Sequence, residues 1–350
     1  MTIDTKIIKI DPATDLAPQL ASAAEIIRAG GLVAFPTETV YGLGADGTSA
    51  TAAARIYAAK GRPSDNPLII HISDPTEAEA YTYTNSVYYR LAAAFMPGPM
   101  TVILPARDTV PPTTRGGLST VAVRCPENPI ARTLIRLAGV PIAAPSANLS
   151  GSPSPTTAAH VIDDMMGRVD MIIDGGACEF GLESTIVKVD ADGGVTLLRP
   201  GRISPDDIRS LGIEVRIADA VTDRLRDGEV ALSPGMKYRH YAPSAEVLLL
   251  DGDREASLHF IAAEGRENPA VIAYTADVDF YREALPFATV IDFGSEGDEL
   301  AQARSLFAIL RDADKHSYSV IYAPLPRQEG IGLALYNRMI RAAAHKIIKL

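Results

Sequence analysis

Short apolar runs alternate along the chain with segments of helical periodicity. The runs are rich in Val, Ile and Leu, which is typical of buried strands. We expect strands at residues 32–35, 67–72, 101–104, 120–124, 141–144 and 171–173, and helices at residues 15–29, 50–60, 77–83, 88–95, 129–138 and 156–166. A hairpin formed by residues 183–189 and 195–199 follows them. Strands interleaved with helices and closed by a hairpin predict an open α/β sheet that is mixed rather than purely parallel.

A second and smaller α/β unit is expected near the C-terminus. The pattern predicts strands at residues 247–250, 270–273, 289–292 and 320–322, and helices at residues 254–264, 297–312 and 333–348. The segment before it, residues 233–243, has prolines near both ends, several aromatic or imidazole rings and two cations, unlike a passive linker. We therefore divide the chain into a first domain (1–205), a connector (206–243) and a second domain (244–350).

Composition and charge limit the classes of function. The 350 residues are 47% apolar and 22% charged, as in an ordinary soluble protein. No apolar run reaches the roughly 18 residues of a membrane span, and no signal peptide is evident, so a cytoplasmic protein without membrane contact is expected. A net charge of −10 argues against a surface that grips nucleic acid along its whole length. The two cysteines, Cys125 and Cys178, cannot form a disulfide framework, and the scattered histidines make a zinc site unexpected.

The stretch from Gly31 to His71 carries the densest set of chemically special residues. Lys60 and Arg62 flank a glycine just after the expected helix, and nearby prolines would stiffen their loop. Ammonium and guanidinium groups pair with phosphate oxygens, so this loop could clamp a polyphosphate. The alternative is a solvated turn. No phosphate-binding P-loop, complete dinucleotide fingerprint or hydrolase nucleophile motif occurs.

Other polar residues stand at the ends of expected strands. Arg124 ends an apolar strand, where burial is costly unless an anion meets it, either a substrate carboxylate or a neighbouring Glu. The loop 145–151 offers hydroxyls and backbone N–H groups before a helix, as a nucleotide pocket or as a simple N-capping loop. His71 alone reads more readily as a structural residue than as a catalyst. Together, these strand ends favour a ligand with phosphates.

Several motifs, in order, resemble those of the YrdC family. They are Phe35-Pro-Thr-Glu-Thr-Val-Tyr-Gly-Leu-Gly44, Lys60-Gly-Arg-Pro63, Asn66-Pro-Leu68, Pro97-Gly-Pro-Met-Thr101, Val123-Arg-Cys-Pro126, Pro145-Ser-Ala-Asn148, Ser150-Gly151, Glu183-Ser-Thr-Ile-Val187 and Leu198-Arg-Pro-Gly201. Two further stretches resemble the longer, two-domain form of that family: Ser233-Pro-Gly-Met-Lys-Tyr-Arg-His-Tyr-Ala-Pro243 and Gly332-Leu-Ala-Leu-Tyr-Asn-Arg338.

This resemblance implies an L-threonylcarbamoyladenylate synthase. Such enzymes combine L-threonine, bicarbonate or CO2, and ATP with Mg²⁺, and they release pyrophosphate. Their product passes to threonylcarbamoyl transferase machinery that acts on tRNA, and weak tRNA binding is compatible with this role. The implied fold is a twisted sheet with a concave basic face, followed by a Rossmann-like second domain.

The resemblance also assigns site residues. Lys60 and Arg62 would be catalytic cations that stabilise phosphate charge. The threonine site would comprise Thr39, His71, Arg124, Ala144 and Ser184. The ATP site would comprise Lys60, Arg62, Asn66, Thr120, Ser146, Asn148, Ser154, Arg199, His240 and Tyr241, with residues 233–243 acting as a lid. The metal ligands stay open.

Two rival functions remain at this stage. A concave basic face could bind RNA without catalysis, although the acidic net charge disfavours this. A carbamoyl-transfer enzyme of hydrogenase maturation also uses a domain of this type, but it carries acylphosphatase and zinc-finger segments upstream, for which the N-terminal region is expected to have no room.

Overall fold

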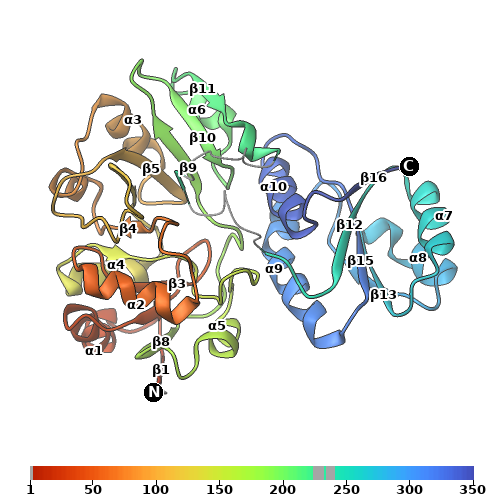
Figure 1. Ribbon diagram of the computed structural model, residues 1–350, viewed down its shortest axis with the longest axis horizontal. Helices are drawn as coiled ribbons and strands as arrows, with labels where there is room; N and C mark the ends of the chain where they lie inside the picture. The colour runs from red at the N-terminus through yellow and green to blue at the C-terminus, as the bar shows by residue number, and fades with distance from the viewer. Residues whose placement is uncertain (1–2, 224–231, 234–240) are drawn as a thin grey trace.

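The computed structural model describes residues 3–223, 232–233 and 241–350, which form two α/β domains side by side (Figure 1). The first domain is built on an eleven-stranded sheet. In spatial order, its strands are β1 (Lys6–Lys9), β8 (Met171–Asp174), β2 (Val33–Phe35), β3 (Gly42–Asp46), β7 (Ile142–Ala143), β4 (Ile69–His71), β6 (Thr120–Arg124), β5 (Met100–Pro105), β9 (Thr185–Val189), β10 (Val195–Arg199) and β11 (Val215–Ile217). Parallel and antiparallel pairs occur together, so the predicted mixed sheet is confirmed.

Helices cover both faces of this sheet. One face packs against α1 (Leu16–Arg28) and α4 (Pro129–Ala138). The other packs against α2 (Ala50–Lys60), α3 (Ser86–Phe95), α5 (Ala158–Met165) and α6 (Pro205–Arg209). A 3-10 helix at Pro75–Ala80 stands where we expect an α-helix at residues 77–83.

The strand β3 was not expected, because its glycines resemble a turn. Gly44 lies so close to the Phe35 ring and the Ile142 methyl that a Cβ at this position would come within 2.7 Å of both. Glycine is needed there to let neighbouring strands approach. The expected hairpin is present as β9 and β10, and β11 extends the first sheet beyond residue 205 by pairing with β10.

The second domain is a five-stranded parallel sheet, as the βαβ pattern predicts. Its strands, in spatial order, are β14 (Thr289–Asp292), β13 (Pro269–Ala273), β15 (Val320–Pro324), β12 (Glu246–Asp251) and β16 (Ile347–Lys349). One face carries α7 (Arg254–Glu264) and α8 (Val278–Ala284), and the other carries α9 (Glu299–His316) and α10 (Gly332–Ala342). The helix expected at 333–348 is too long, because Ala344 and His345 have positive φ angles of 50° and 64° and turn the chain into β16.

The helices α9 and α10 face the first domain (Figure 1). Every residue of α10 is buried. The core on this side of the second sheet also includes Val40 and Leu182 of the first domain, so the two domains share apolar packing. Among the residues that the structure describes, no helix combines the length and apolar composition that a membrane crossing needs.

Candidate active site

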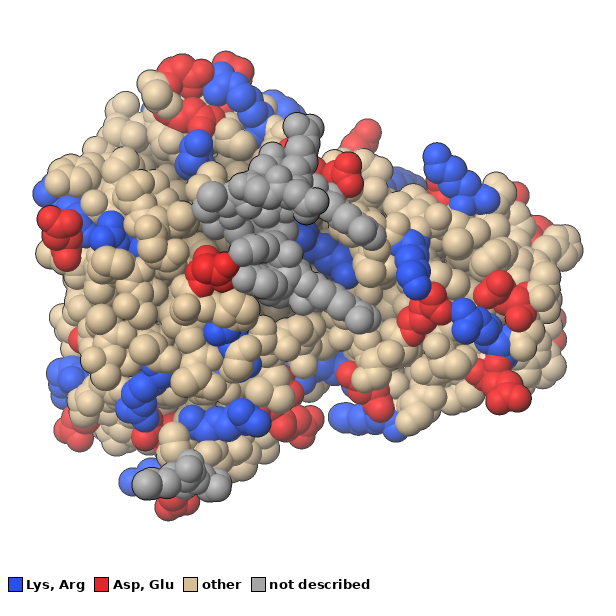
Figure 2. Space-filling view, viewed as in Figure 1, with Lys and Arg blue, Asp and Glu red and all other residues tan. Residues whose placement is uncertain are grey.

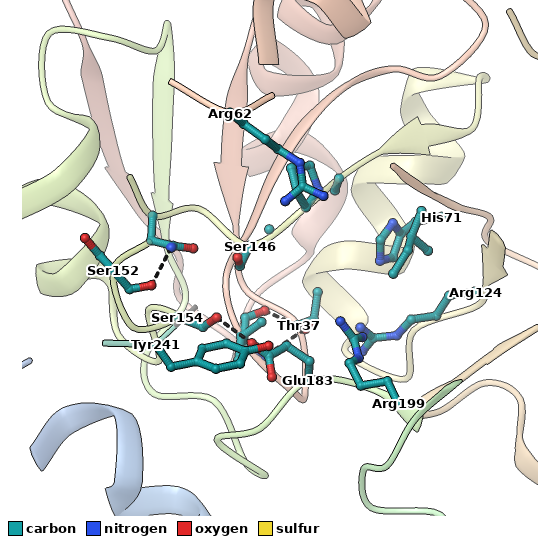
Figure 3. Close-up of a pocket in the computed structure, with 16 residues that line it drawn as sticks. Thr37, Arg62, His71, Arg124, Ser146, Ser152, Ser154, Glu183, Arg199 and Tyr241 are labelled. Carbon is teal, nitrogen blue, oxygen red and sulfur yellow. Dashed lines mark hydrogen bonds between the residues drawn. The ribbon is translucent and has the colours of Figure 1, made fainter. Parts of the chain in front are cut away.

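A cavity of about 610 Å³, which includes space open to solvent, lies in the first domain next to its border with the second. Several strands end at it: His71 is the last residue of β4, Arg124 of β6 and Arg199 of β10. The lining residues are Thr37, Val40, Gly42, Arg62, Ile69, His71, Arg124, Ala144, Pro145, Ser146, Asn148, Ser152, Ser154, Glu183, Arg199 and Tyr241. In Figure 3, His71, Arg124 and Arg199 lie on one side of this space, and Ser152, Ser154 and Tyr241 lie on the other.

Arg124 is buried and pairs with a buried carboxylate. Its Nη2 donates to Glu38 Oε1 at 2.6 Å, and only 5% and 3% of the two side chains is exposed. The neighbouring Glu is thus one partner of this arginine. The Nε of Arg124 has no hydrogen-bond partner among the described residues. A buried guanidinium that lines a cavity and has an N–H group to spare suits an anionic ligand.

His71 is buried beside Arg124. Its Nδ1 lies 3.3 Å from the carbonyl oxygen of Ile142. Because a carbonyl can only accept, Nδ1 carries the proton. Burial, assisted by the charge of Arg124, lowers the pKa of His71 to about 3, so the imidazole is neutral near pH 7. The Nε2 of His71 can then accept a hydrogen bond, whereas the arginines around it can only donate.

Arg199 is held by Ser184. The Nε and Nη2 of Arg199 donate to the carbonyl and hydroxyl oxygens of Ser184, each at 3.0 Å. The Ser184 hydroxyl also lies 2.7 Å from the hydroxyl of Thr101. Burial lowers the pKa of Arg199 to about 10, so it stays charged at neutral pH. Ser184 is not among the cavity-lining residues and acts here as a support for Arg199.

Lys60 lies behind the loop that follows β7. Its Nζ donates to the carbonyl oxygens of Ser146 and Asn148 at 2.6 and 2.5 Å. Burial, and next the charge of Arg62, lower the pKa of Lys60 well below its usual range. Even a neutral amine keeps two N–H groups, so both hydrogen bonds survive in either protonation state. Lys60 thus holds this loop, and its assignment to phosphate stays a prediction.

A left-handed glycine and the contacts of Arg62 shape the loop between α2 and β4. Gly61 takes a left-handed conformation (φ 61°) and redirects the chain after α2. Arg62 then donates to the carbonyl oxygens of Asn66 and Pro67 at 3.2–3.4 Å and also lines the cavity. The Oδ1 of buried Asn66 has no partner among the described residues.

The remaining predicted residues divide between the cavity and its surroundings. Ala144, Ser146, Asn148, Ser154 and Tyr241 line it. Thr39 is buried behind Thr37, with 2.8 Å between their hydroxyl oxygens, and the cavity lining within the described chain includes Thr37 instead. Thr120 begins β6, at the opposite end from Arg124. His240 lies outside the described residues.

Tyr241 reaches the cavity from the domain border. It has a positive φ of 62°, stacks on Phe307 of α9 with ring centroids 5.1 Å apart, and lies 5.8 Å from the guanidinium of Arg338. A non-glycine residue in this conformation is uncommon and needs surrounding contacts to hold it.

Sequence reasoning missed Glu183, although it named the motif that Glu183 begins. This carboxylate accepts from the Ser154 hydroxyl at 2.5 Å and from Arg338 Nε of the second domain at 2.8 Å. Arg338 lies 155 positions further along the chain, so sequence spacing could not reveal this pair. For Thr37, the only signal was its place in the motif Phe35-Pro-Thr-Glu-Thr-Val-Tyr-Gly-Leu-Gly44.

Acid is expected to weaken this contact between the domains. Burial alone would raise the pKa of Glu183, but Arg338 and Arg199 outweigh it and lower the pKa to about 2. The pair therefore contributes stability above the unfolded pKa of about 4.3, and this contribution is lost as the pH falls toward 2. We expect wild type to exceed Glu183→Gln in unfolding free energy by on the order of 1–3 kcal/mol at pH 7. Chemical denaturation of both proteins at several pH values would measure this difference in unfolding free energy. A difference that is the same at pH values of about 5 and 2.5 would contradict a stabilising role of the ionised Glu183.

The described residues around the cavity form no metal cage. Within the described part of the chain, no group of three His, Cys, Asp or Glu residues is placed to hold an ion. Both carboxylate oxygens of Glu183 are already engaged by Ser154 and Arg338. Mg²⁺ commonly relies on substrate phosphates and water rather than on a complete set of protein ligands, and the residues present fit that mode.

Both domains match models of known protein families. Residues 25–201 match the family model Sua5_yciO_yrdC, described as telomere recombination, and residues 203–344 match Sua5_C, described as the C-terminal domain of threonylcarbamoyl-AMP synthase. Threonylcarbamoyl-AMP synthase of Pyrococcus abyssi is 43% identical over 93% of this chain and 94% of its own length. The Bacillus subtilis protein of that name is 41% identical over 95% of each chain.

A solved structure agrees with these sequence matches. The crystal structure of P. abyssi Sua5 complexed with L-threonine is similar over 99% of this chain and 100% of that one, with 42% identity and a TM-score of 0.89. Sequence motifs, two matching domain models and one shared fold lead to the same assignment: the chain belongs to the Sua5/YciO/YrdC family, in its long two-domain form.

Proposed function

We propose that this chain is a threonylcarbamoyl-AMP synthase that joins L-threonine, bicarbonate or CO2, and ATP. One observation supports this proposal most strongly. The same cavity contains Arg124, which suits an amino-acid carboxylate, and a serine-rich loop with Arg62 and Arg199, which suit a nucleotide. The relatives of similar length carry this activity in their names, and one was solved with L-threonine.

Threonine would occupy the side of the cavity that contains Arg124 and His71. The free N–H of Arg124 would donate to the substrate carboxylate, while Glu38 holds the guanidinium in place. Neutral His71 offers an acceptor to the threonine hydroxyl or amine. Thr37 and the backbone at Ala144 complete this side, with Thr39 behind Thr37. Ser184 stays assigned to threonine as a prediction.

ATP would occupy the side formed by the loop 144–154. Arg62 and Arg199 approach the cavity from two directions (Figure 3) and would bind phosphate oxygens. Ser146, Asn148 and Ser154 would contact the nucleotide, and Tyr241 would cover it. Lys60, Asn66, Thr120 and His240 stay assigned to ATP as predictions, and Lys60 and Arg62 stay assigned to catalysis.

The reaction balances without a protein nucleophile. The threonine amine adds to bicarbonate with loss of water, or to CO2 with loss of a proton, and gives a carbamate. A carbamate oxygen then attacks the α-phosphorus of ATP, the bond to the bridging oxygen breaks, and pyrophosphate leaves. The cavity residues bind and orient the substrates and stabilise negative charge, and such positioning and charge stabilisation give large rate effects in phosphate chemistry.

Mg²⁺, held by the ATP phosphates and water, would neutralise phosphate charge when bound. The cytoplasm, which holds ATP and tRNA, stays the expected location. Product would pass to a transferase acting on tRNA.

The RNA-binding alternative receives less support. On the face shown in Figure 2, Lys and Arg side chains are interspersed with Asp and Glu over both domains and form no continuous basic band. Non-specific RNA affinity depends on clustered cations. The arginines of the cavity are instead buried.

Pyrophosphate release tests the proposal. The purified chain should release pyrophosphate only when threonine, bicarbonate and ATP are all present, and omission of any one should reduce the rate to background. Release without threonine would contradict the proposed reaction, and so would binding of tRNA with no release under any condition.

A further inference from the structure

Two arginines of the second domain reach the wall of the cavity. Arg311 lies on α9, and Arg338 lies in the buried helix α10. The reaction proposed above uses neither of them, and the stretch 332–338 has no role in it. Their contacts nevertheless converge on one part of the site, the loop of residues 148–154.

Arg311 holds this loop near both of its ends. Its Nη1 and Nη2 donate to the two carboxylate oxygens of Asp164 at 3.2 and 2.6 Å, and Nη2 also donates to the Pro153 carbonyl at 2.7 Å. Asp164 Oδ2 in turn accepts from the Leu149 amide at 3.1 Å. The paired side chains are only 9% and 12% exposed, so solvent screens them little.

Arg338 reaches the end of the same loop through Glu183. Its side chain is fully buried, and it donates from Nε to Glu183 Oε2 at 2.8 Å. The other oxygen of Glu183 accepts from the Ser154 hydroxyl at 2.5 Å. Asn337 orients the guanidinium of Arg338 by accepting a hydrogen bond from Nη1 at 2.8 Å. The Asn337 amide itself donates to the Val221 carbonyl at 2.6 Å.

The loop needs such support. Residues 150–155 are Ser-Gly-Ser-Pro-Ser-Pro, and Gly151 has a positive φ of 97°. Glycine loses more conformational freedom than any other residue when it is fixed in one conformation. Lys60 of the first domain anchors the start of the loop, at Asn148 and Ser150. The second domain contacts Pro153 directly and Ser154 by way of Glu183. Ser154 lines the cavity, and so does Ser152, the neighbour of Pro153.

We propose that the second domain positions the nucleotide-binding loop 148–154 through Arg311 and, by way of Glu183, through Arg338. The inference rests on the proposed function in taking this loop as the ATP side of the cavity. Both arginines are positioning residues, because they act on Ser154, Pro153 and Leu149 rather than on a substrate. The threonine side depends on contacts within the first domain, from Glu38 to Arg124 and from Ile142 to His71.

Kinetics of the full-length chain would separate this role from general support of the fold. Arg311→Met and Arg338→Lys should each raise the KM for ATP roughly 10-fold or more. Arg311→Met loses the hydrogen bonds to Pro153 and Asp164, and Arg338→Lys loses the planar guanidinium that places Glu183 against Ser154. The dissociation constant of L-threonine, measured without ATP, should stay within about twofold. Arg338→Lys keeps the charge that balances Glu183 and so protects folding. Arg304→Met is the matched control, because Arg304 donates to the Glu179 carbonyl across the same domain border, away from the cavity lining.

Two further measurements do not depend on turnover. In the unliganded protein, the Leu149 amide should exchange its hydrogen faster in Arg311→Met than in wild type or Arg304→Met. Affinity for α,β-methylene-ATP should fall in parallel with the rise in KM. The inference is overturned if loop exchange and nucleotide affinity match wild type, or if threonine and nucleotide affinity fall together. Wild type that binds the analogue but releases no pyrophosphate would instead count against the proposed function alone.

Discussion

Removing the guanidinium of Arg124 is expected to raise the KM for threonine about 100-fold or more, while the KM for ATP changes less than about threefold. Arg124 lines the cavity and its Nε has no hydrogen-bond partner among the described residues, so a substrate carboxylate would lose a charge-assisted donor when the guanidinium is removed. Replacement of Arg124 alone would leave the Glu38 carboxylate buried and unpaired, at a cost of several kcal/mol, ~3–5. The change should therefore be made as Arg124→Met in a Glu38→Gln background.

The matched control is Glu38→Gln with Arg124 retained. It keeps the guanidinium in the cavity, so the threonine KM should rise far less than in the double variant. Steady-state pyrophosphate release at varied threonine and varied ATP provides both constants. An equal loss of apparent affinity for the two substrates in the double variant would contradict the assignment of Arg124 to the threonine carboxylate.

Replacing Arg199 by Met is expected to lower kcat roughly 10²- to 10³-fold, with smaller changes in the KM of either substrate. Arg199 is buried, charged at neutral pH and held by Ser184, so its orientation is preset. A preorganised cation stabilises the charge that develops on the phosphates more than it stabilises bound ATP.

Two further variants serve as controls for the Arg199→Met prediction. Arg199→Lys keeps the positive charge but loses the planar guanidinium and its paired N–H donors. Its kcat should therefore lie between those of Arg199→Met and wild type. Arg202→Met removes a nearby exposed arginine, which packs near the Phe180 ring, and should leave kcat unchanged. A wild-type kcat in Arg199→Met, with only the ATP KM raised, would make Arg199 a binding residue alone.

Local patterns predicted the sheet well where strands are apolar and buried. The runs ending at His71 and Arg124 were recognised as strands, and both end at the cavity. Short or glycine-containing strands were missed: β3 because Gly42 and Gly44 weaken a strand signal, and β1, β11 and β16 because each is a short edge strand with few buried positions.

The site was predictable to the extent that its residues belong to local motifs. The motif around Lys60 pointed to phosphate chemistry, but only the fold places its ammonium behind the loop 144–154. Glu183 and Arg338 pair across the two domains, and Arg311 meets Asp164 in the same way. Such long-range contacts leave no periodicity in the sequence, so neither hydrophobic pattern nor spacing could reveal that the second domain supports the site.

The identity of the product tests the central claim most directly. The chain would be incubated with L-threonine, ATP and ¹³C-bicarbonate, quenched early and examined by mass spectrometry. We expect an adenylate whose mass equals AMP plus threonine plus CO2 less water, and whose mass increases when the bicarbonate is labelled. An adenylate of threonine whose mass does not respond to the label would contradict it.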